Sequence, residues 1–346
     1  MNKDVLFGKT LSELQQVIST TGLPSFTAKQ IAEWLYKKNV SSIDEMTNIS
    51  VKNRNILKEL FDIGIVSYSK VQESVDGTKK YLFQTSKGKF IESAYIPDDN
   101  RATLCVSSQV GCKMGCLFCM TGKQGFQNHL HAGEIVNQVR SLPEFEKLTN
   151  VVYMGMGEPF DNLEEVLKSL EILTSDYGYG WSPKRITVSS IGIIPGLKAF
   201  LHRSKCHLAI SLHSPFDKER LSLMPIQNVY PIKDILDEIK AFDFGLQRRV
   251  SFEYIMFKGI NDTPRHASEL SRILNGIKCR INLIRFHPIP DTPLLGSDEE
   301  TIVLFQNALE AKGIITTIRA SRGLDIFAAC GLLSTKELVK SKEADY

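Results

Sequence analysis

From residue 101 onward, short apolar runs alternate with amphipathic runs, and this alternation limits the folds open to the chain. The strand-like runs are TLCVSSQV, NVVYMGMG, RITVSS, HLAISLH, VSFEYIMF, RINLIRF and ITTIRAS. Between them lie helical runs such as AGEIVNQVRSL, LEEVLKSLEIL, IKDILDEIKAF and ASELSRIL. Repeated strand–helix units predict a parallel sheet covered by helices, either a barrel or a doubly wound sheet. Polar residues gather where these strands end, which favours a barrel with its active site at the carboxyl ends.

The first part of the chain carries a helical pattern instead. LSELQQVI has helical spacing after Thr10, TAKQIAEWLYKKN begins at Thr27 as a capping residue, and VKNRNILKELF follows Ser50. We expect a helical accessory domain over residues 1–64.

The next segment reads as short strands separated by turn residues. SYSKVQES, KKYLFQT and KFIESAYIP flank Asp76-Gly77 and a second turn, which predicts a β-hairpin region over residues 65–100. Glu92 lies in the last of these runs. The series of strand–helix units would then occupy residues 101–335, followed by a tail at 336–346.

Composition adds a few limits. The 346 residues hold no apolar run near the roughly 18 residues that a membrane helix needs, and the start has no signal-peptide pattern. A cytoplasmic protein without membrane association is therefore expected. The net charge of +3 does not prove a nucleic-acid partner. Local basic clusters could follow a phosphate backbone if they share a face, or could be scattered solvated charges; they are Lys79-Lys80, Lys184-Arg185, Arg248-Arg249, and Lys278, Arg280 and Arg285.

Seven cysteines are bunched rather than spread as a disulfide framework would be. Cys112, Cys116 and Cys119 form C-x₃-C-x₂-C directly after the first strand of the series. A structural zinc site normally has a fourth protein ligand, and no paired motif follows. Three close thiolates suit an iron–sulfur cluster that leaves one iron without a protein ligand. Cys105 precedes this motif by seven residues.

The motif resembles the signature of radical S-adenosylmethionine (SAM) enzymes, with Phe118 before the last cysteine. Longer segments resemble the RlmN/Cfr family of RNA adenine methyltransferases, from about Phe26 to Leu332. They are RATLCVSSQVGCKMGCLFCMTGKQGF, YMGMGEPFDN, ISLHSP and SRGLDIFAACGLL. TGKQGF is more similar to the adenine C2 methylases than to the C8 methylases of antibiotic resistance.

The resemblance implies a partial (β/α)6-type barrel for residues 101–335, and it also implies the cofactors and the catalytic residues. A 4Fe–4S cluster on Cys112, Cys116 and Cys119 would bind SAM and cleave it to a radical, and two SAM molecules would be consumed per turnover. The first would methylate Cys330. The radical from the second would activate that methyl group for addition to adenine. Cys105 would then release the product by forming a transient disulfide with Cys330, and Glu92 matches a proton acceptor.

The resemblance also implies SAM contacts at the strand ends. Gly157 permits close backbone approach, and the Glu158 carboxylate can pair with an ammonium group. Leu212 would contribute backbone. At one position the chain departs from the pattern: the C2 methylases usually carry Asn where this sequence has His287. The other implied contacts are Ser189, Ser211 and His213.

Together these features predict a methyltransferase for adenine C2 in 23S rRNA, and for the adenine 3′ to the anticodon in tRNA. Its electron donor would be flavodoxin-like, and the protein a monomer. C8 methylation is the near alternative. A radical-SAM activase is a more distant one, which leaves Cys105 and Cys330 without a role. A zinc-stabilised RNA-binding protein is the non-enzyme alternative.

Overall fold

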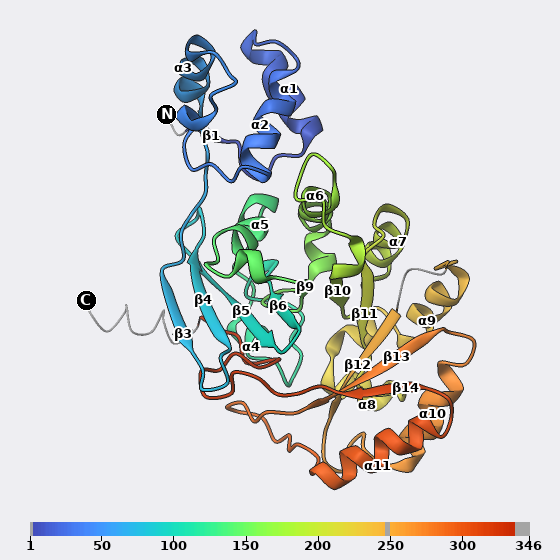
Figure 1. Cartoon of the computed structure of the whole chain (residues 1–346). Helices are drawn as coiled ribbons and strands as arrows, with labels where there is room; N and C mark the ends of the chain where they lie inside the picture. The colour runs from blue at the N-terminus through green and yellow to red at the C-terminus, as the bar shows by residue number, and fades with distance from the viewer. Residues whose placement is uncertain (1–2, 246–249, 336–346) are drawn as a thin grey trace.

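The computed structural model describes residues 3–245 and 250–335. The expected tail at 336–346 and the basic pair Arg248-Arg249 lie outside these residues. Figure 1 shows three parts: a group of helices at the N-terminal end, a set of antiparallel strands, and a large sheet covered by helices. The N-terminal helices lie beyond the helices that cover the sheet and pack against them: Lys168 pairs with Glu13 at 2.7 Å, and the rings of Tyr36 and Tyr179 are 5.9 Å apart.

The N-terminal helices are α1 (Leu11–Thr21), α2 (Thr27–Tyr36) and α3 (Val51–Leu60), as predicted. Thr10 and Glu13 form a reciprocal capping box at the start of α1, and Ser50 caps α3. The expectation that Thr27 caps α2 is wrong. Phe26 precedes this helix without a side-chain cap, and Thr27 is buried inside the first turn. Short strands β1 (Asp4–Val5) and β2 (Phe61–Asp62) pair in parallel and close this unit.

A sheet of ten strands forms the centre of the molecule. The predicted hairpin region is present as antiparallel strands, with Gly77 in the left-handed conformation at φ 81° in its first turn. These strands continue the parallel series, to which β6 connects them. The order is β14-β13-β12-β11-β10-β9-β6-β5-β4-β3. The antiparallel strands are β3 (Lys70–Glu73), β4 (Lys79–Gln84) and β5 (Phe90–Asp98).

The parallel strands match the predicted runs, with one correction. The run TLCVSSQV does not form one strand: β6 ends at Cys105, and Gln109–Val110 forms a separate strand, β7, paired with β8 (Asn128–His129). Strands β6 and β9 to β13 supply the six strands of the expected partial barrel, and β14 adds a further edge strand. The parallel strands are β6 (Arg101–Cys105), β9 (Asn150–Tyr153), β10 (Ile186–Ser190), β11 (His207–Ser211), β12 (Val250–Met256), β13 (Cys279–Arg285) and β14 (Ile315–Ile318).

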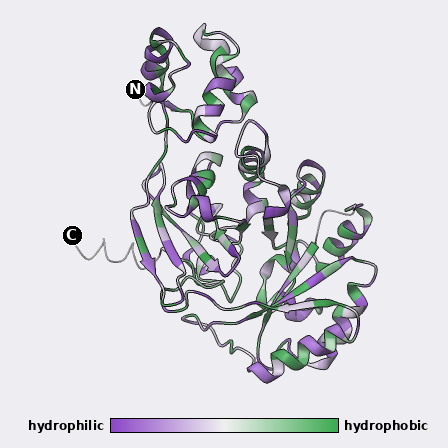
Figure 2. Ribbon diagram, in the orientation of Figure 1, coloured by the Kyte–Doolittle hydropathy of each residue, from purple (hydrophilic) through white to green (hydrophobic). Residues whose placement is uncertain are grey.

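Amphipathic helices follow the strands and pack on the sheet. In α10, for example, Ala267 and Leu270 are fully buried while Arg272 faces solvent. Burying such a leucine stabilises the fold by roughly 2 kcal/mol. Figure 2 shows hydrophobic residues in the central strands and alternating character along the helices. The helices are α4 (Met120–Gln124), α5 (Ala132–Arg140), α6 (Leu163–Thr174), α7 (Ile194–Arg203), α8 (Asp217–Leu223), α9 (Ile232–Ala241), α10 (Pro264–Ile273) and α11 (Glu299–Glu310).

After β14 the chain crosses back toward the hairpin strands as an irregular segment, residues 319–335, which we call the strap (Figure 1). Asp325 accepts a hydrogen bond from the Ser74 hydroxyl at 2.5 Å, and Gly323 N–H donates to Asp76 at 2.8 Å. The hairpin turn therefore fixes the first half of the strap, which carries Cys330 in its second half.

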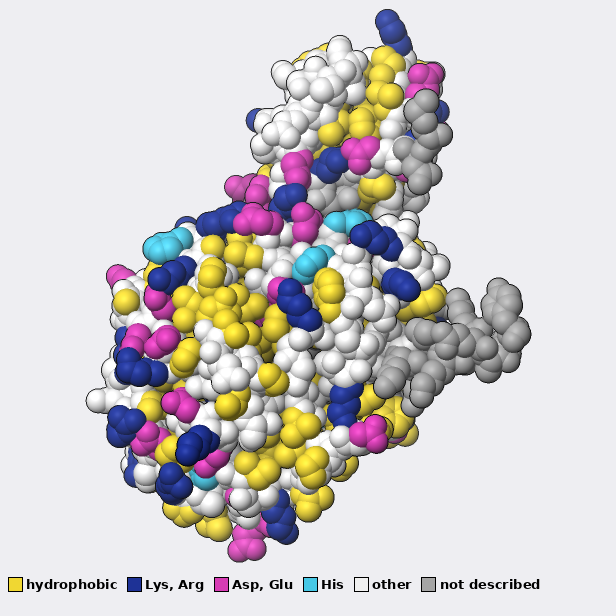
Figure 3. Space-filling model, turned by 180° about the vertical axis from the view of Figure 1, so that it is seen from behind, with side chains coloured by type: hydrophobic (Ala, Val, Ile, Leu, Met, Phe, Trp, Pro, Cys, Tyr) yellow, Lys and Arg dark blue, Asp and Glu magenta, His cyan; other side chains and the backbone are white. Residues whose placement is uncertain are grey.

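The outer surface carries charges of both signs. On the face in Figure 3, Lys and Arg side chains are interspersed with Asp and Glu around a patch of hydrophobic side chains. Among the described residues, no helix has both the length and the apolar character to cross a membrane.

Candidate active site

Two cavities meet at the carboxyl ends of the parallel strands. The first, of about 150 Å³, is called the cysteine cavity. The second, of about 130 Å³, lies under the strap and is called the strap cavity. Cys119, Arg319 and Cys330 line both. The cysteine cavity also brings together most of the predicted site residues: Cys112, Cys116, Gly157, Glu158, Ser189, Ser211 and His213.

The three cysteines of the motif lie on a loop that joins β7 to α4, and Cys119 is the residue before the first turn of α4. Burial raises the pKa of Cys112 to about 12 and that of Cys116 well above the ordinary thiol value. Nearby thiols add to both shifts, so the sulfurs share one electrostatic environment. A metal centre would have to displace these protons, since the thiolate is the ligand.

No group of three or more His, Cys, Asp or Glu side chains in residues 3–245 and 250–335 is already arranged around a metal ion. The donor set nevertheless fits an iron–sulfur cluster, because three thiols line one cavity beside a glycine-lined wall. Gly157 has φ 99°, and a Cβ there would lie 2.5 Å from the Gln109 Cβ. The chain at Gly157 therefore accepts no side chain, because its backbone packs closely against Gln109 where it lines the cavity.

Glu158 joins the ends of two strands. Its two carboxylate oxygens accept hydrogen bonds from the backbone N–H groups of Phe160 and Ile191, each at 3.0 Å. Burial raises the pKa of Glu158 to about 7, against the opposing effect of these bonds. A carboxylate has further lone pairs, so Glu158 can still accept from an ammonium group in the cavity.

His213 is fixed in a single tautomer. Its Nδ1 accepts a hydrogen bond from Ile255 N–H at 3.0 Å, which leaves Nε2 as the donor. Burial, with the Arg220 cation, lowers the pKa of His213 to about 3, so the ring is neutral. Its ring meets Phe118 of the cysteine motif edge-on, at 4.8 Å between centroids.

Leu212 does not line either cavity, and its backbone groups already have protein partners. Its N–H donates to the Glu253 carbonyl at 3.0 Å, and its carbonyl accepts from Ser214 N–H at 2.7 Å. Arg220, which the sequence did not single out, also donates to this carbonyl and to those of Ile191 and Ser211. This buried cation holds the ends of β10 and β11 in place.

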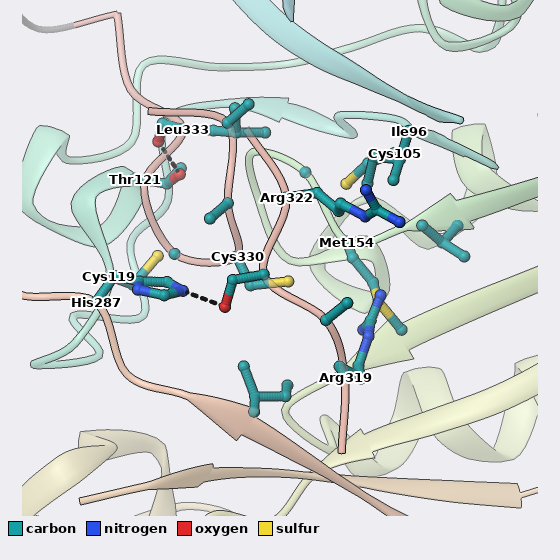
Figure 4. A pocket seen from close by; sticks show the side chains of 18 residues that line it. Ile96, Cys105, Cys119, Thr121, Met154, His287, Arg319, Arg322, Cys330 and Leu333 are labelled. Atoms are coloured by element: carbon teal, nitrogen blue, oxygen red, sulfur yellow. Dashed lines mark hydrogen bonds between the residues drawn. The ribbon is translucent and has the colours of Figure 1, made fainter. Parts of the chain in front are cut away.

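Cys330 is held beside the cysteine motif by hydrogen bonds between the strap and α4. Met120 N–H donates to the Gly331 carbonyl at 2.8 Å, and the Thr121 hydroxyl donates to the Leu333 carbonyl at 2.7 Å. The Cys330 residue itself is exposed. Figure 4 shows Cys105, Cys119 and Cys330 on the walls of the strap cavity. The structure thus brings together two thiols that lie far apart in the sequence.

Cys105 lies at the end of β6 and packs against Ile326 and Ala328 of the strap. Burial, then the neighbouring Cys330 thiol, raises the pKa of Cys105 to about 12. Cys105 is therefore a neutral thiol at pH 7. Arg319, which the sequence reading missed, opposes this shift. Its own pKa is raised by Cys330 and by Glu253, with which it pairs at 3.4 Å. The only available signal was its position near the end of the predicted strand run ITTIRAS; the strand itself ends one residue earlier, at Ile318.

Glu92 and His287 lie at different places from the SAM contacts. Glu92 is buried and pairs with Lys80 at 3.1 Å. It also accepts a hydrogen bond from Ser334 N–H at 3.0 Å, which ties the end of the strap to β5. Burial raises the pKa of Glu92, although Lys80 lowers it. His287 lines the strap cavity, where its Nε2 lies 2.9 Å from the Ser321 hydroxyl (Figure 4). The roles proposed for both residues remain predictions.

Comparison with known proteins agrees with this arrangement. Residues 106–270 match the family model of the radical SAM superfamily, and residues 5–63 match that of the ribosomal RNA large subunit methyltransferase N-terminal domain. A crystal structure of a radical SAM methyltransferase from Sphaerobacter thermophilus superposes with a TM-score of 0.88 at 38% identity. That alignment covers 95% of this chain and 99% of the other.

Two curated relatives extend the match over nearly the full chain. A probable dual-specificity RNA methyltransferase RlmN of Phocaeicola vulgatus is 59% identical, covering 98% of this chain and 97% of the relative. The dual-specificity RNA methyltransferase RlmN of Syntrophus aciditrophicus is 43% identical, covering 98% of each chain.

The fold and the cysteine cavity define a radical SAM enzyme, whose chemistry uses a 4Fe–4S cluster and SAM. The catalysed reaction is a SAM-dependent methylation of RNA. This chain belongs to the RlmN family of dual-specificity RNA methyltransferases.

Proposed function

We propose that this protein methylates C2 of an adenine in 23S rRNA and of the adenine 3′ to the anticodon in tRNA. The observation that carries the proposal is the position of Cys330. It lines the cysteine cavity and the strap cavity at once, with Cys105 on the wall of the latter. A residue so placed can take a methyl group at one cavity and pass it to a base at the other.

Cys112, Cys116 and Cys119 would hold the cluster, and Gly157, Glu158, Ser189, Ser211 and His213 would contact SAM. Bound together, cluster and SAM supply a carbon-centred radical. His287 would donate a further hydrogen bond to SAM from the strap-cavity side. The backbone contact that the resemblance implies for Leu212 gains no support, because its N–H and its carbonyl are bonded to Glu253, Ser214 and Arg220.

The chain's own residues would carry the methyl group. The Cys330 sulfur takes a methyl group from a first SAM, and the carbon of that group becomes bonded to adenine C2. The base is then joined to the protein through a carbon–sulfur bond. Because Arg319 lies beside both thiols, its fixed positive charge stabilises the thiolate that each sulfur needs to react.

Release of the product would be the task of Cys105. The ring proton at C2 is lost, the Cys105 sulfur attacks the Cys330 sulfur, and a sulfur–sulfur bond forms as the carbon–sulfur bond breaks. The methylene carbon keeps the electron pair of the broken bond and takes up a proton, which leaves a methyl group on the ring. Two thiols have then been oxidised to a disulfide, which a thiol reductant must restore before the next turnover. Glu92 would serve as proton acceptor, although its present contacts are with Lys80 and Ser334.

The remaining assignments follow from the same reading. We propose that the chain divides into a helical domain at 1–64, a hairpin region at 65–100 and a partial barrel at 101–335. We also propose that the protein acts in the cytoplasm as a monomer and receives electrons from a flavodoxin-like donor. The family model that matches residues 5–63 supports the first boundary.

Mass spectrometry of nucleosides tests the proposal. Holoenzyme with its cluster would be incubated anaerobically with unmodified 23S rRNA or tRNA, SAM and reductant, and the RNA digested. We expect 2-methyladenosine from both RNAs. If 8-methyladenosine were the only product, this result would support the C8 alternative and contradict the proposed C2 regiochemistry.

A further inference from the structure

A third cavity lies at the opposite end of the partial barrel, and at about 750 Å³ it is much the largest of the three. We call it the amino-end cavity, because its walls are the first halves of the parallel strands. Arg101 opens β6, Asn150 opens β9, and Arg280 is the second residue of β13. Lys184, from the turn before β10, closes another side.

The amino-end cavity and the strap cavity share part of their walls. Arg319, Arg322 and Met154 line both. These side chains lie between the two spaces, so the amino-end cavity approaches the strap cavity, which Cys105 and Cys330 line, from the other side of this shared wall.

The cations of this cavity outnumber its carboxylates, and the carboxylates are already engaged. Asp98 pairs with Arg322 at 3.3 Å. Glu253 pairs with Arg319 at 3.4 Å and accepts from Asn282 at 2.7 Å. Arg101, Lys184 and Arg280 are left with no ion pair or side-chain hydrogen bond to any residue within 3–245 and 250–335.

These cations also repel one another. Burial, then the neighbouring Arg319 and Arg280 cations, lower the pKa of Arg101, against the opposing effect of the Asp98 carboxylate. All three arginines line the amino-end cavity. Like charges gathered around one space destabilise the free protein, and an anion that enters the space would relieve this repulsion. On the face shown in Figure 3, by contrast, side chains of the two signs are interspersed.

We propose that the amino-end cavity is the entrance for the RNA strand, with Arg101, Lys184 and Arg280 holding its phosphates and one extruded nucleotide reaching toward Cys330. This inference rests on the proposed function. The cysteine cavity at the other end would hold the cluster and SAM. The amino-end cavity, which has the larger volume, therefore remains for the nucleotide. The three cations come from different walls, which suits several phosphates of one strand. Neutral polar groups beside them, such as Asn150 and Asn282, can contact ribose and base edges.

Arg101→Gln, Arg280→Gln and the double variant test the entrance. Each would be purified as holoenzyme and titrated with a fluorescent anticodon stem–loop RNA at several salt concentrations. We expect each single substitution to raise the Kd roughly 3- to 10-fold and to lower the salt slope by about 0.7 to 1, with additive effects in the double variant. The KM for RNA methylation should rise by the same factor.

The matched control is Arg272→Gln, on the outside of α10 and paired with Glu269. It removes the same charge, and its RNA affinity and methylation should equal those of the wild type. Arg101→Lys retains a cation and should restore most of the affinity. Iron content and melting temperature establish that each variant is folded.

The inference is wrong if the folded double variant keeps the wild-type Kd and salt slope while the wild type methylates RNA. If instead the wild-type holoenzyme methylates no RNA at all, the proposed function itself has failed.

Discussion

The two ends of the barrel satisfy their polar groups in opposite ways. At the carboxyl ends, Glu158, His213 and Arg220 are buried and each is tied to backbone groups of neighbouring strands. At the amino ends, Arg101 and Arg280 line a wide cavity without ion-pair partners in the described part of the chain. A rigid, fully bonded site suits small cofactors that must be held in one geometry. Unpaired cations around an open space suit a large anionic substrate.

Loss of the Cys330 thiol at the carboxyl end should have the largest effect. In Cys330→Ser no methylated adenosine should be detectable, because the hydroxyl is a far weaker nucleophile than a thiolate. Iron content and RNA affinity should stay at wild-type values. The control is Cys279→Ser at the start of β13, which lines none of the three cavities. Product from Cys330→Ser would show that another group carries the methyl.

Cys105→Ala should stop the reaction one step later. The base would be joined to Cys330 but not released, so a covalent protein–RNA species should accumulate to a substantial fraction of the enzyme. A denaturing gel with labelled RNA measures it. Cys206→Ala, which removes a buried thiol directly before β11 and outside the strap cavity, should give free product and no adduct. Normal turnover by Cys105→Ala would remove the role assigned to Cys105.

The protonation of Cys105 predicts a pH dependence. Its pKa of about 12 means that it is a thiol at neutral pH. Below that pKa the thiolate fraction rises about tenfold per pH unit, so adduct release should accelerate by that factor from pH 7 to pH 8. The measurement follows loss of the pre-formed adduct in rapid-quench samples. A release rate that does not change over this range would contradict attack by a thiolate in equilibrium with solvent.

The smallest effect is expected for Lys184 at the amino end. A flexible, exposed lysine contributes one point charge, so Lys184→Gln should raise the Kd for RNA only about 3-fold and lower the salt slope by less than 1. Lys218→Gln, which removes an exposed lysine from α8, is the control and should bind RNA like the wild type. If both substitutions raised the Kd for RNA equally, RNA binding would depend on the net charge of the protein and not on the position of Lys184 in the cavity.

Local spacing was enough to predict the cysteine motif and most strands, because each depends on residues close in the chain. Long-range packing decided the rest. Arg319 and Arg220 carry no motif, and Arg101 opens a family-like segment that assigns it no role; their importance appears only when strands from distant parts of the sequence meet. The basic pairs of the sequence were a poor guide for the same reason. Lys79 and Lys80 pair with Glu144 and Glu92, and Arg285 pairs with Glu299, whereas Lys184 and Arg280 line the cavity.

Glu92 shows the limit of reading a residue's role from its place in a motif. The sequence could not say which way its side chain faces on the strand. In the folded chain it faces inward, bound to Lys80 and to Ser334 N–H, because β5 packs its inner face against the end of the strap. Through its two partners, Lys80 and Ser334, Glu92 links β4 to the strap, which carries Cys330.

The chemical structure of the adduct trapped by Cys105→Ala tests the central claim most directly. The adduct would be digested with protease and nuclease, and the linked peptide and nucleoside sequenced by tandem mass spectrometry. The account predicts a single methylene bridge from the Cys330 sulfur to C2 of adenine. A link at any other residue, or at C8 of the base, would contradict it.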